Sequence, residues 1–130
     1  LDQFKIVNNT SGHTAGDELL KTIADAITRA LAAETAQIAR LGGDEFGILA
    51  EDVTTARGRV LANEVLDAVR AERFEWDGRI YTQSASMGLV FIDQTTDSVD
   101  SAMQYADEAC YAAKDAGRGR VVVSREASGR

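Results

Sequence analysis

The sequence predicts a mixed α/β fold in a single domain, and three observations support that prediction. Segments whose apolar residues recur at helical spacing alternate with short runs that are typical of β-strands. The pairs Gly42-Gly43 and Asp77-Gly78 each stand between two strand-like runs and signal tight turns. The 130 residues fit one domain, and the 45% of apolar residues suffices for a hydrophobic core.

The first expected element is a helix over residues 16–34, preceded by an irregular stretch over residues 1–15. The apolar residues of the helix recur three and four positions apart, with charged residues between them, so we expect one buried face that packs on the sheet. These apolar residues are Leu20, Ile23, Ala24, Ile27 and Leu31.

Two pairs of strands are expected. The first pair lies near 37–41 and 46–51, with Asp44 at the hairpin tip, because apolar runs flank the Gly-Gly corner. Residues 74–93 predict the second pair, because the Asp-Gly dipeptide within them is a strong hairpin signal. The run 87–92 is almost wholly apolar, as expected for a strand that is covered on both faces.

Two further helices are expected. Residues 54–73 predict one, which either Thr54 or Thr55 could cap. Residues 98–117 predict the other, which should end at Gly117. The expected buried residues of this last helix are Val99, Ala102, Met103, Ala106, Ala109, Cys110 and Ala113.

The chain is expected to close with a short strand over residues 120–124. We therefore assign residues 1–124 to the domain. The polar residues 125–130 are expected to form a flexible tail or the start of a linker.

The composition excludes some function classes. The net charge of −7 argues against binding a nucleic-acid polymer, which requires clustered Lys and Arg, but it leaves room for a nucleotide held through a metal ion. The single cysteine, Cys110, cannot form an internal disulfide, which indicates a reducing compartment. Because no apolar run approaches the length of a membrane span, we expect a cytoplasmic domain and leave open whether the full-length protein is membrane-anchored.

The Gly-Gly corner is followed at once by Asp44 and Glu45. Glycine lets a backbone approach a ligand closely, and two carboxylates at a hairpin tip could hold Mg²⁺, which prefers oxygen ligands and often bridges to phosphates. The alternative is a solvated turn that is acidic without a ligand.

The first seventeen residues concentrate polar side chains ahead of the expected helix. Asp17 could be a helix N-cap or first-turn acid, Asn8 could serve turn geometry, and His13 is interpreted as a structural hydrogen-bond partner. The sharper alternative is a base-recognition pocket. A carboxylate can accept from the ring N–H and exocyclic amine of guanine, and an amide can donate or accept at the remaining edge.

Lys114 and Arg118 stand four positions apart near the end of the last helix, so we expect them on one face. They could simply be cations that interact favourably with the helix C-terminus. Alternatively, the pair could neutralise a polyphosphate.

Taken together, these clusters resemble one known family. The segment RLGGDEF at Arg40 to Phe46 contains the complete five-residue signature of GGDEF domains, the diguanylate cyclases. The opening LDQFKIVNNTSGHTAGD looks like the family pattern DxFKxxND…GHxxGD, SASMGLV looks like SxSIGxA, and ADEACYAAKDAGRGRV looks like ADxAxYxAKxxGRNxV. The four motifs occur in the family's order and cover nearly the whole chain.

The resemblance implies a palm-like fold related to nucleotidyl cyclases and polymerases, with a mostly antiparallel central sheet flanked by helices. It also implies that two GTP molecules, one on each domain of a homodimer, are condensed into cyclic di-GMP with release of two pyrophosphates. Such a reaction requires orientation of two reactants and neutralisation of charge at phosphorus, much of it by Mg²⁺ or Mn²⁺.

The resemblance also implies roles for individual residues. Asp44 and the backbone carbonyl of Leu1 match metal ligands, and Glu45 matches a neighbouring acid that assists the 3′-hydroxyl. Asn8 and Asp17 match the guanine contacts. The remaining substrate-binding positions are Phe4 and Lys5 in a short loop from Gln3 to Lys5, Gly42 and Gly43 at the corner, and Lys114 and Arg118 at the phosphates.

The chain departs from the family pattern at several positions. A further metal-ligand aspartate and the first core strand of the family precede the position of Leu1, so we expect the natural protein to extend N-terminally, with its first strand trimmed from this sequence. Asn9 replaces a usual aspartate, and the closing GRN is GRG. The positions of a product-binding RxxD motif carry Ala33 and Ala36, so we expect no cyclic di-GMP site there.

Two functions from different classes are carried forward. The first is an active diguanylate cyclase, which the intact Gly42–Phe46 signature favours. The second is a GTP-binding regulatory domain without turnover, as found beside cyclic di-GMP phosphodiesterase (EAL) domains, because several segments are similar to tandem GGDEF–EAL chains. Sensory and EAL domains are therefore expected partners in the full-length protein.

Overall fold

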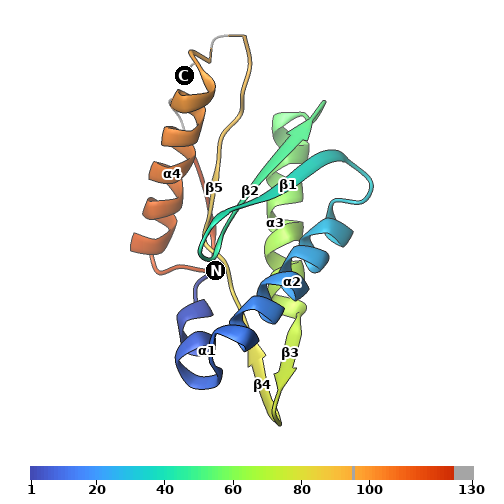
Figure 1. Cartoon of the computed structure of the whole chain (residues 1–130). Coiled ribbons are helices and arrows are strands. Elements are labelled where there is room, and N and C mark those ends of the chain that lie inside the picture. Colours follow the sequence, from blue (N-terminus) through green and yellow to red (C-terminus); the bar gives the residue numbers. More distant parts are fainter. Residues whose placement is uncertain (95, 125–130) are drawn as a thin grey trace. The chain divides into compact units, whose positions relative to one another are not determined.

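The computed structural model describes residues 1–94 and 96–124 (Figure 1). These residues form two compact units, which divide between Ser84 and Ala85. The predicted tail over residues 125–130 lies outside the described residues. Helices and short strands alternate as predicted for a mixed α/β chain. Each unit is described by itself below.

The first unit contains three helices and two hairpins. Its elements are α1 (Phe4–Ser11), α2 (His13–Ala30), β1 (Thr35–Gly42), β2 (Glu45–Glu51), α3 (Thr55–Ala71), β3 (Arg73–Trp76) and β4 (Arg79–Thr82). The second unit contains β5 (Met87–Leu89), α4 (Val99–Asp115) and β6 (Val121–Val123).

Helix α1 corrects the prediction of an irregular stretch over residues 1–15. The helix has eight residues and buries one of them, Val7, so its apolar periodicity is too short to be recognised in the sequence. A helix of this length depends on tertiary contacts, and α1 packs along α2. Gly12, with φ of 91°, separates the two helices, and its N–H donates to the Asn8 carbonyl at 2.9 Å.

Helix α2 carries the predicted buried stripe. Leu20, Ile23, Ile27 and Leu31 are each 5% exposed or less, which confirms the expected core face. The helix begins at His13 rather than residue 16 and ends at Ala30 rather than residue 34. Its closest backbone neighbours are α1 and α3, with a smaller contact to β3.

The β1–β2 hairpin is confirmed as predicted. The strands are antiparallel, Arg40 pairs with Phe46, and Gly42 pairs with Glu45, so Gly43 and Asp44 form the two-residue tip. The register shifts between Arg40 and Gly42.

The segment from α3 to β4 also follows the predictions. The Thr54 hydroxyl caps α3 by accepting from the Arg57 N–H at 3.1 Å, and the apolar face of α3 is buried. Strands β3 and β4 are antiparallel around Asp77 and Gly78, whose φ values of 48° and 77° fit the tight turn that an Asp-Gly pair signals. Phe74 is buried at the base of this hairpin.

In the second unit, the strand predicted over residues 87–92 is shorter and less buried than expected. The strand expected over 87–92 is limited to the half-buried Met87–Leu89, and Ile92 is 59% exposed. Strand β5 runs parallel to β6, which is also three residues long, so the ladder cannot extend further. The backbone of Gly88 lies directly against α4 near Ala106 and Cys110.

Helix α4 ends as predicted but buries fewer residues than expected. The N–H of Arg118 donates to the Ala113 carbonyl and that of Gly117 to the Lys114 carbonyl, which is the Schellman arrangement around a left-handed glycine. Val99 and Met103 are 78% and 41% exposed, against the prediction. The buried residues of α4 are Ala102, Ala109 and Ala113.

The hydrogen-bonded strands form three two-stranded sheets, β1-β2, β3-β4 and β5-β6, rather than one continuous central sheet. No strand within residues 1–94 and 96–124 joins two of these ladders. Across the same residues, no helix combines the length and apolar character needed to cross a membrane.

Candidate functional site

Asp44 lies at the β1–β2 tip, next to the first residue of the sequence. Asp44 is half-buried, with 36% of its side chain exposed. The backbone nitrogen of Leu1 lies 3.0 Å from the Asp44 carbonyl oxygen and 3.7 Å from its Oδ2. This contact is made by the terminal nitrogen of Leu1 and not by its carbonyl oxygen, which is the predicted ligand.

The two glycines leave the approach to this tip open. A Cβ added to Gly42 or Gly43 would meet no atom within 4 Å. Gly43 has φ of 50°, a conformation that glycine adopts without strain, and its carbonyl accepts from Arg40 Nε at 2.8 Å. Glu45, the first residue of β2, is exposed beside this open corner.

The predicted guanine contacts lie on α1 and α2. Asn8 is on α1, and its Oδ1 is buried without a hydrogen-bond partner. Asp17 is exposed on α2, where it is the fifth helical residue. The interpretation of Asp17 as an N-cap or first-turn acid is therefore wrong, because the helix begins earlier and Gly12 occupies the N-cap.

Phe4 and Lys5 correct another prediction, since they form the first turn of α1 rather than a loop. The half-buried Phe4 ring contacts Gly16, and Lys5 is exposed. The first N–H groups of a helix have no intrahelical acceptor and point outward along the helix axis, so they favour anions. The start of α1 can therefore offer the same backbone donors that were expected from a loop.

Sequence reasoning missed the residue that holds the start of α1 in place. The Ser84 hydroxyl donates to Asp2 Oδ2 at 2.6 Å, and the Ser84 N–H donates to Gln3 Oε1 at 2.8 Å. The Asp2 N–H in turn donates to the Ser84 carbonyl at 2.9 Å. Ser84 is the first residue of the SASMGLV segment, and its place in that family-like segment was the only sign in the sequence that it could matter for the site.

Lys114 and Arg118 belong to the second unit, so the structure does not place them relative to the hairpin tip. Lys114 is in the last turn of α4, whereas Arg118 lies past its end with φ of 65°. The prediction that both share one helix face is wrong, because the chain leaves the helix at Gly117. Both side chains are exposed.

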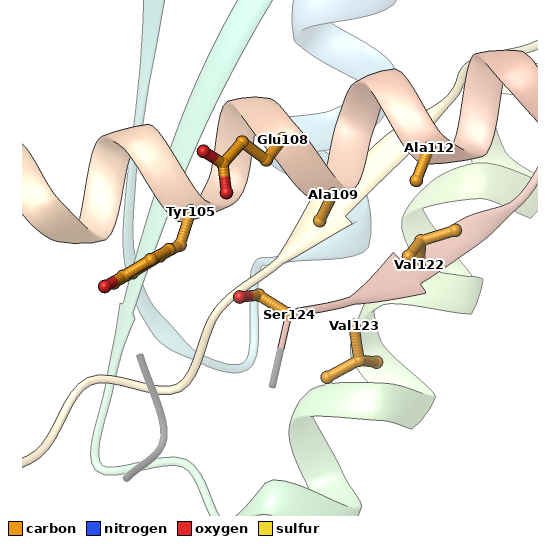
Figure 2. Close-up of a pocket in the computed structure, with 7 residues that line it drawn as sticks. All are labelled: Tyr105, Glu108, Ala109, Ala112, Val122, Val123 and Ser124. Carbon is orange, nitrogen blue, oxygen red and sulfur yellow. The ribbon is translucent and has the colours of Figure 1, made fainter. Parts of the chain in front are cut away.

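A hollow of about 240 Å³ lies on the second unit, between α4 and β6 (Figure 2). It is lined by Tyr105, Glu108, Ala109, Ala112, Val122, Val123 and Ser124. None of these residues was predicted for the site, and most of the lining is small or apolar.

The described part of the chain contains no group of three or more His, Cys, Asp or Glu side chains placed to hold a metal ion. A metal at the hairpin tip would therefore depend on the Asp44 carboxylate and on backbone oxygen. Both are hard oxygen donors of the kind that Mg²⁺ prefers, so the donor set fits that ion.

Comparison with known proteins identifies the family. The model of the family "Diguanylate cyclase, GGDEF domain" matches residues 1–120. The chain is 43% identical over 123 residues to the probable diguanylate cyclase DgcE of Escherichia coli K12, covering 95% of this chain and 11% of DgcE. It is 34% identical over 123 residues to the cyclic di-GMP phosphodiesterase PdeR of the same organism, covering 95% of this chain and 18% of PdeR.

Solved structures of GGDEF domains support the same family assignment. The GGDEF domain of YfiN (TpbB) from Pseudomonas aeruginosa superimposes with a TM-score of 0.85 at 31% identity, over 95% of this chain and 77% of that chain. The chain spans between a tenth and a third of the length of the curated relatives named as cyclases DgcE, DgcT and Treponema denticola diguanylate cyclase A. These matches confirm the predicted palm-like mixed α/β fold, and the chain belongs to the GGDEF family of diguanylate cyclase domains.

Proposed function

We propose that this domain is an active diguanylate cyclase, which condenses two GTP into cyclic di-GMP with release of two pyrophosphates. The observation that carries the proposal is the complete Gly-Gly-Asp-Glu-Phe signature at an open hairpin tip, with the Leu1 backbone beside Asp44. The relatives named as diguanylate cyclases support the same activity.

The metal site of the proposal consists of Asp44 and the backbone carbonyl of Leu1. The position of Asp44 at the open hairpin tip supports the first of these two ligands. A bound Mg²⁺ or Mn²⁺ would supply charge neutralisation at the reacting phosphate. Glu45, which is exposed next to Asp44, would accept a proton from an approaching 3′-hydroxyl.

The nucleotide contacts of the proposal follow the family resemblance. Asn8 and Asp17 would contact guanine, and the backbone N–H groups of Phe4 and Lys5 at the start of α1 would bind phosphate oxygens. Lys114 and Arg118 are assigned to the phosphates as well. Gly42 and Gly43 keep the hairpin tip open for the nucleotide.

The reaction joins two nucleotides, so the proposal requires two domains that face each other as a homodimer. Holding both reactants in line is a large part of the catalysis of such a condensation. We place the domain in the cytoplasm, with sensory or EAL domains as its partners in the full-length protein.

The alternative function is a regulatory domain that binds GTP without turnover. Relatives named as cyclic di-GMP phosphodiesterases, PdeR and PdeB, match this chain at 34% and 33% identity and favour that alternative. The intact signature at Gly42–Phe46 favours the active enzyme instead.

Incubation with GTP and Mg²⁺, followed by chromatography, separates the two functions. We expect cyclic di-GMP from the wild type and none from Asp44→Ala, because loss of a metal ligand removes charge stabilisation of the transition state. Asp25→Ala serves as the matched control, since Asp25 is an exposed carboxylate on α2 that the proposal does not use. GTP binding by the wild type without product would support the regulatory function, and undiminished product from Asp44→Ala would refute the metal role.

A further inference from the structure

Gly16 lies on α2 at the place where α1 packs closest to it. Gly16 is buried, and a Cβ added there would overlap the Oδ1 of Asn8. The same Cβ would lie 3.0 Å from Asn8 Cγ and 3.3 Å from Phe4 Cζ. The absence of a side chain at Gly16 therefore creates the space that the Asn8 amide occupies.

In the structure, the amide oxygen of Asn8 is the end that faces Gly16. Asn8 Oδ1 is buried over Gly16 and has no hydrogen-bond partner among the described residues. The amide nitrogen is at the opposite end of the amide and is not among the side-chain atoms that are buried without a partner. An amide nitrogen is a donor, so Asn8 in this orientation can recognise an acceptor on a ligand.

We infer that Gly16 is a positioning residue that holds Asn8 with its amide nitrogen toward the nucleotide, so that Asn8 recognises a base acceptor rather than a base donor. The inference rests on the proposed GTP site and assigns Asn8 and Asp17 opposite hydrogen-bonding roles. Asp17, as a carboxylate, accepts from base donors.

This division of roles has a consequence for base choice. The acceptors O6 and N7 are present in both guanine and hypoxanthine, whereas the 2-amino donor is present only in guanine. Loss of the Asn8 contact should therefore weaken GTP and ITP by the same factor. Loss of the Asp17 contact should weaken GTP more than ITP.

The test is a double-mutant cycle of Gly16→Ala and Asn8→Ala, with GTP and ITP affinities measured by calorimetry on the full chain in Mg²⁺. Gly16 is in regular helical conformation, so alanine fits its backbone, and the new methyl group would meet the Asn8 amide. We expect Gly16→Ala to weaken both nucleotides by about tenfold, the effect of losing one hydrogen bond to a ligand. In the Asn8→Ala background, where no amide meets the methyl group, we expect no further loss.

If Gly16→Ala folds poorly, the same cycle is measured by unfolding temperature. The four proteins are the wild type, Gly16→Ala, Asn8→Ala and the double variant. Gly16→Ala should lower it in the presence of Asn8 and should not lower it in the Asn8→Ala background. Gly47→Ala is the matched control, because its new Cβ would meet only the side chain of the exposed Leu41.

Wild-type affinity for GTP in Gly16→Ala would overturn the inference while leaving the proposed function intact. A larger loss for GTP than for ITP in that variant would overturn the assigned amide orientation. Absence of GTP binding by the wild type itself would overturn the proposed function and, with it, the role of Gly16.

Discussion

The backbone of Gly88, the glycine of the SASMGLV segment, lies so close to α4 that a side chain has no room there. Replacement of Gly88 by alanine should therefore destabilise the second unit. The new Cβ would overlap the Ala106 carbonyl oxygen and would lie 2.6 Å from the Cys110 nitrogen, whereas ordinary contact begins at 3.4 Å. Both neighbours are backbone atoms of α4, so no side-chain rotation can relieve the overlap. Helix α4 would have to move away from β5 by about 1 Å, which loosens the packing of its buried alanines.

Overpacking of this kind costs about 1–3 kcal/mol and more where backbone must shift, so we expect Gly88→Ala to lose roughly 2–4 kcal/mol of unfolding free energy. Since domains are stable by only about 5–15 kcal/mol, the loss should lower the Tm by roughly 6–15 °C. The assay is thermal and urea unfolding followed by circular dichroism, with Gly47→Ala as the control. Equal stability of Gly88→Ala and the wild type would refute the close approach of β5 to α4.

Two further predictions concern ligands. Asp17→Ala should weaken GTP far more than ATP, because guanine alone offers paired donors to the carboxylate, and an unpaired polar group costs on the order of 1–3 kcal/mol; unchanged GTP affinity in calorimetry would remove Asp17 from the base contact. Titration of cyclic di-GMP should give neither tight binding nor inhibition at Ala33 and Ala36, since two methyl groups offer no charge and the neighbouring Glu34 is already paired with Arg57 at 3.6 Å. Tight binding at this surface would show that the RxxD positions were misassigned.

Local signals predicted the parts of the fold that are decided locally. The Asp77-Gly78 turn, the Thr54 cap and the hairpin tip at Asp44 each depend on a few adjacent residues, and all three are confirmed. The end of α4 at Gly117 is confirmed for the same reason. The same helix end makes the prediction for Lys114 and Arg118 wrong. Gly117 lies between them in a left-handed conformation and turns the chain away, so the two residues do not share a helix face.

Features that depend on distant partners were not predictable from local patterns. Helix α1 buries one residue, Val7, and exists because α2 supports it. Periodicity marked Val99 and Met103 as one face of α4 with their neighbours, but periodicity shows which residues share a face and not whether a partner covers them, and both are exposed. Ser84 holds the start of α1 through hydrogen bonds to Asp2 and Gln3 that span more than eighty residues of sequence, and no local pattern encodes such a pairing.

The central claim is that the hairpin tip at Asp44 and the α1–α2 nucleotide site together perform a condensation, and product stoichiometry tests it most directly. The measurement is simultaneous quantification of pyrophosphate and cyclic di-GMP during incubation of the protein with GTP and Mg²⁺. We expect two pyrophosphates for each cyclic di-GMP, and neither product from Asp44→Ala. GTP that is bound but unchanged, or pyrophosphate released without the dinucleotide, would contradict the claim.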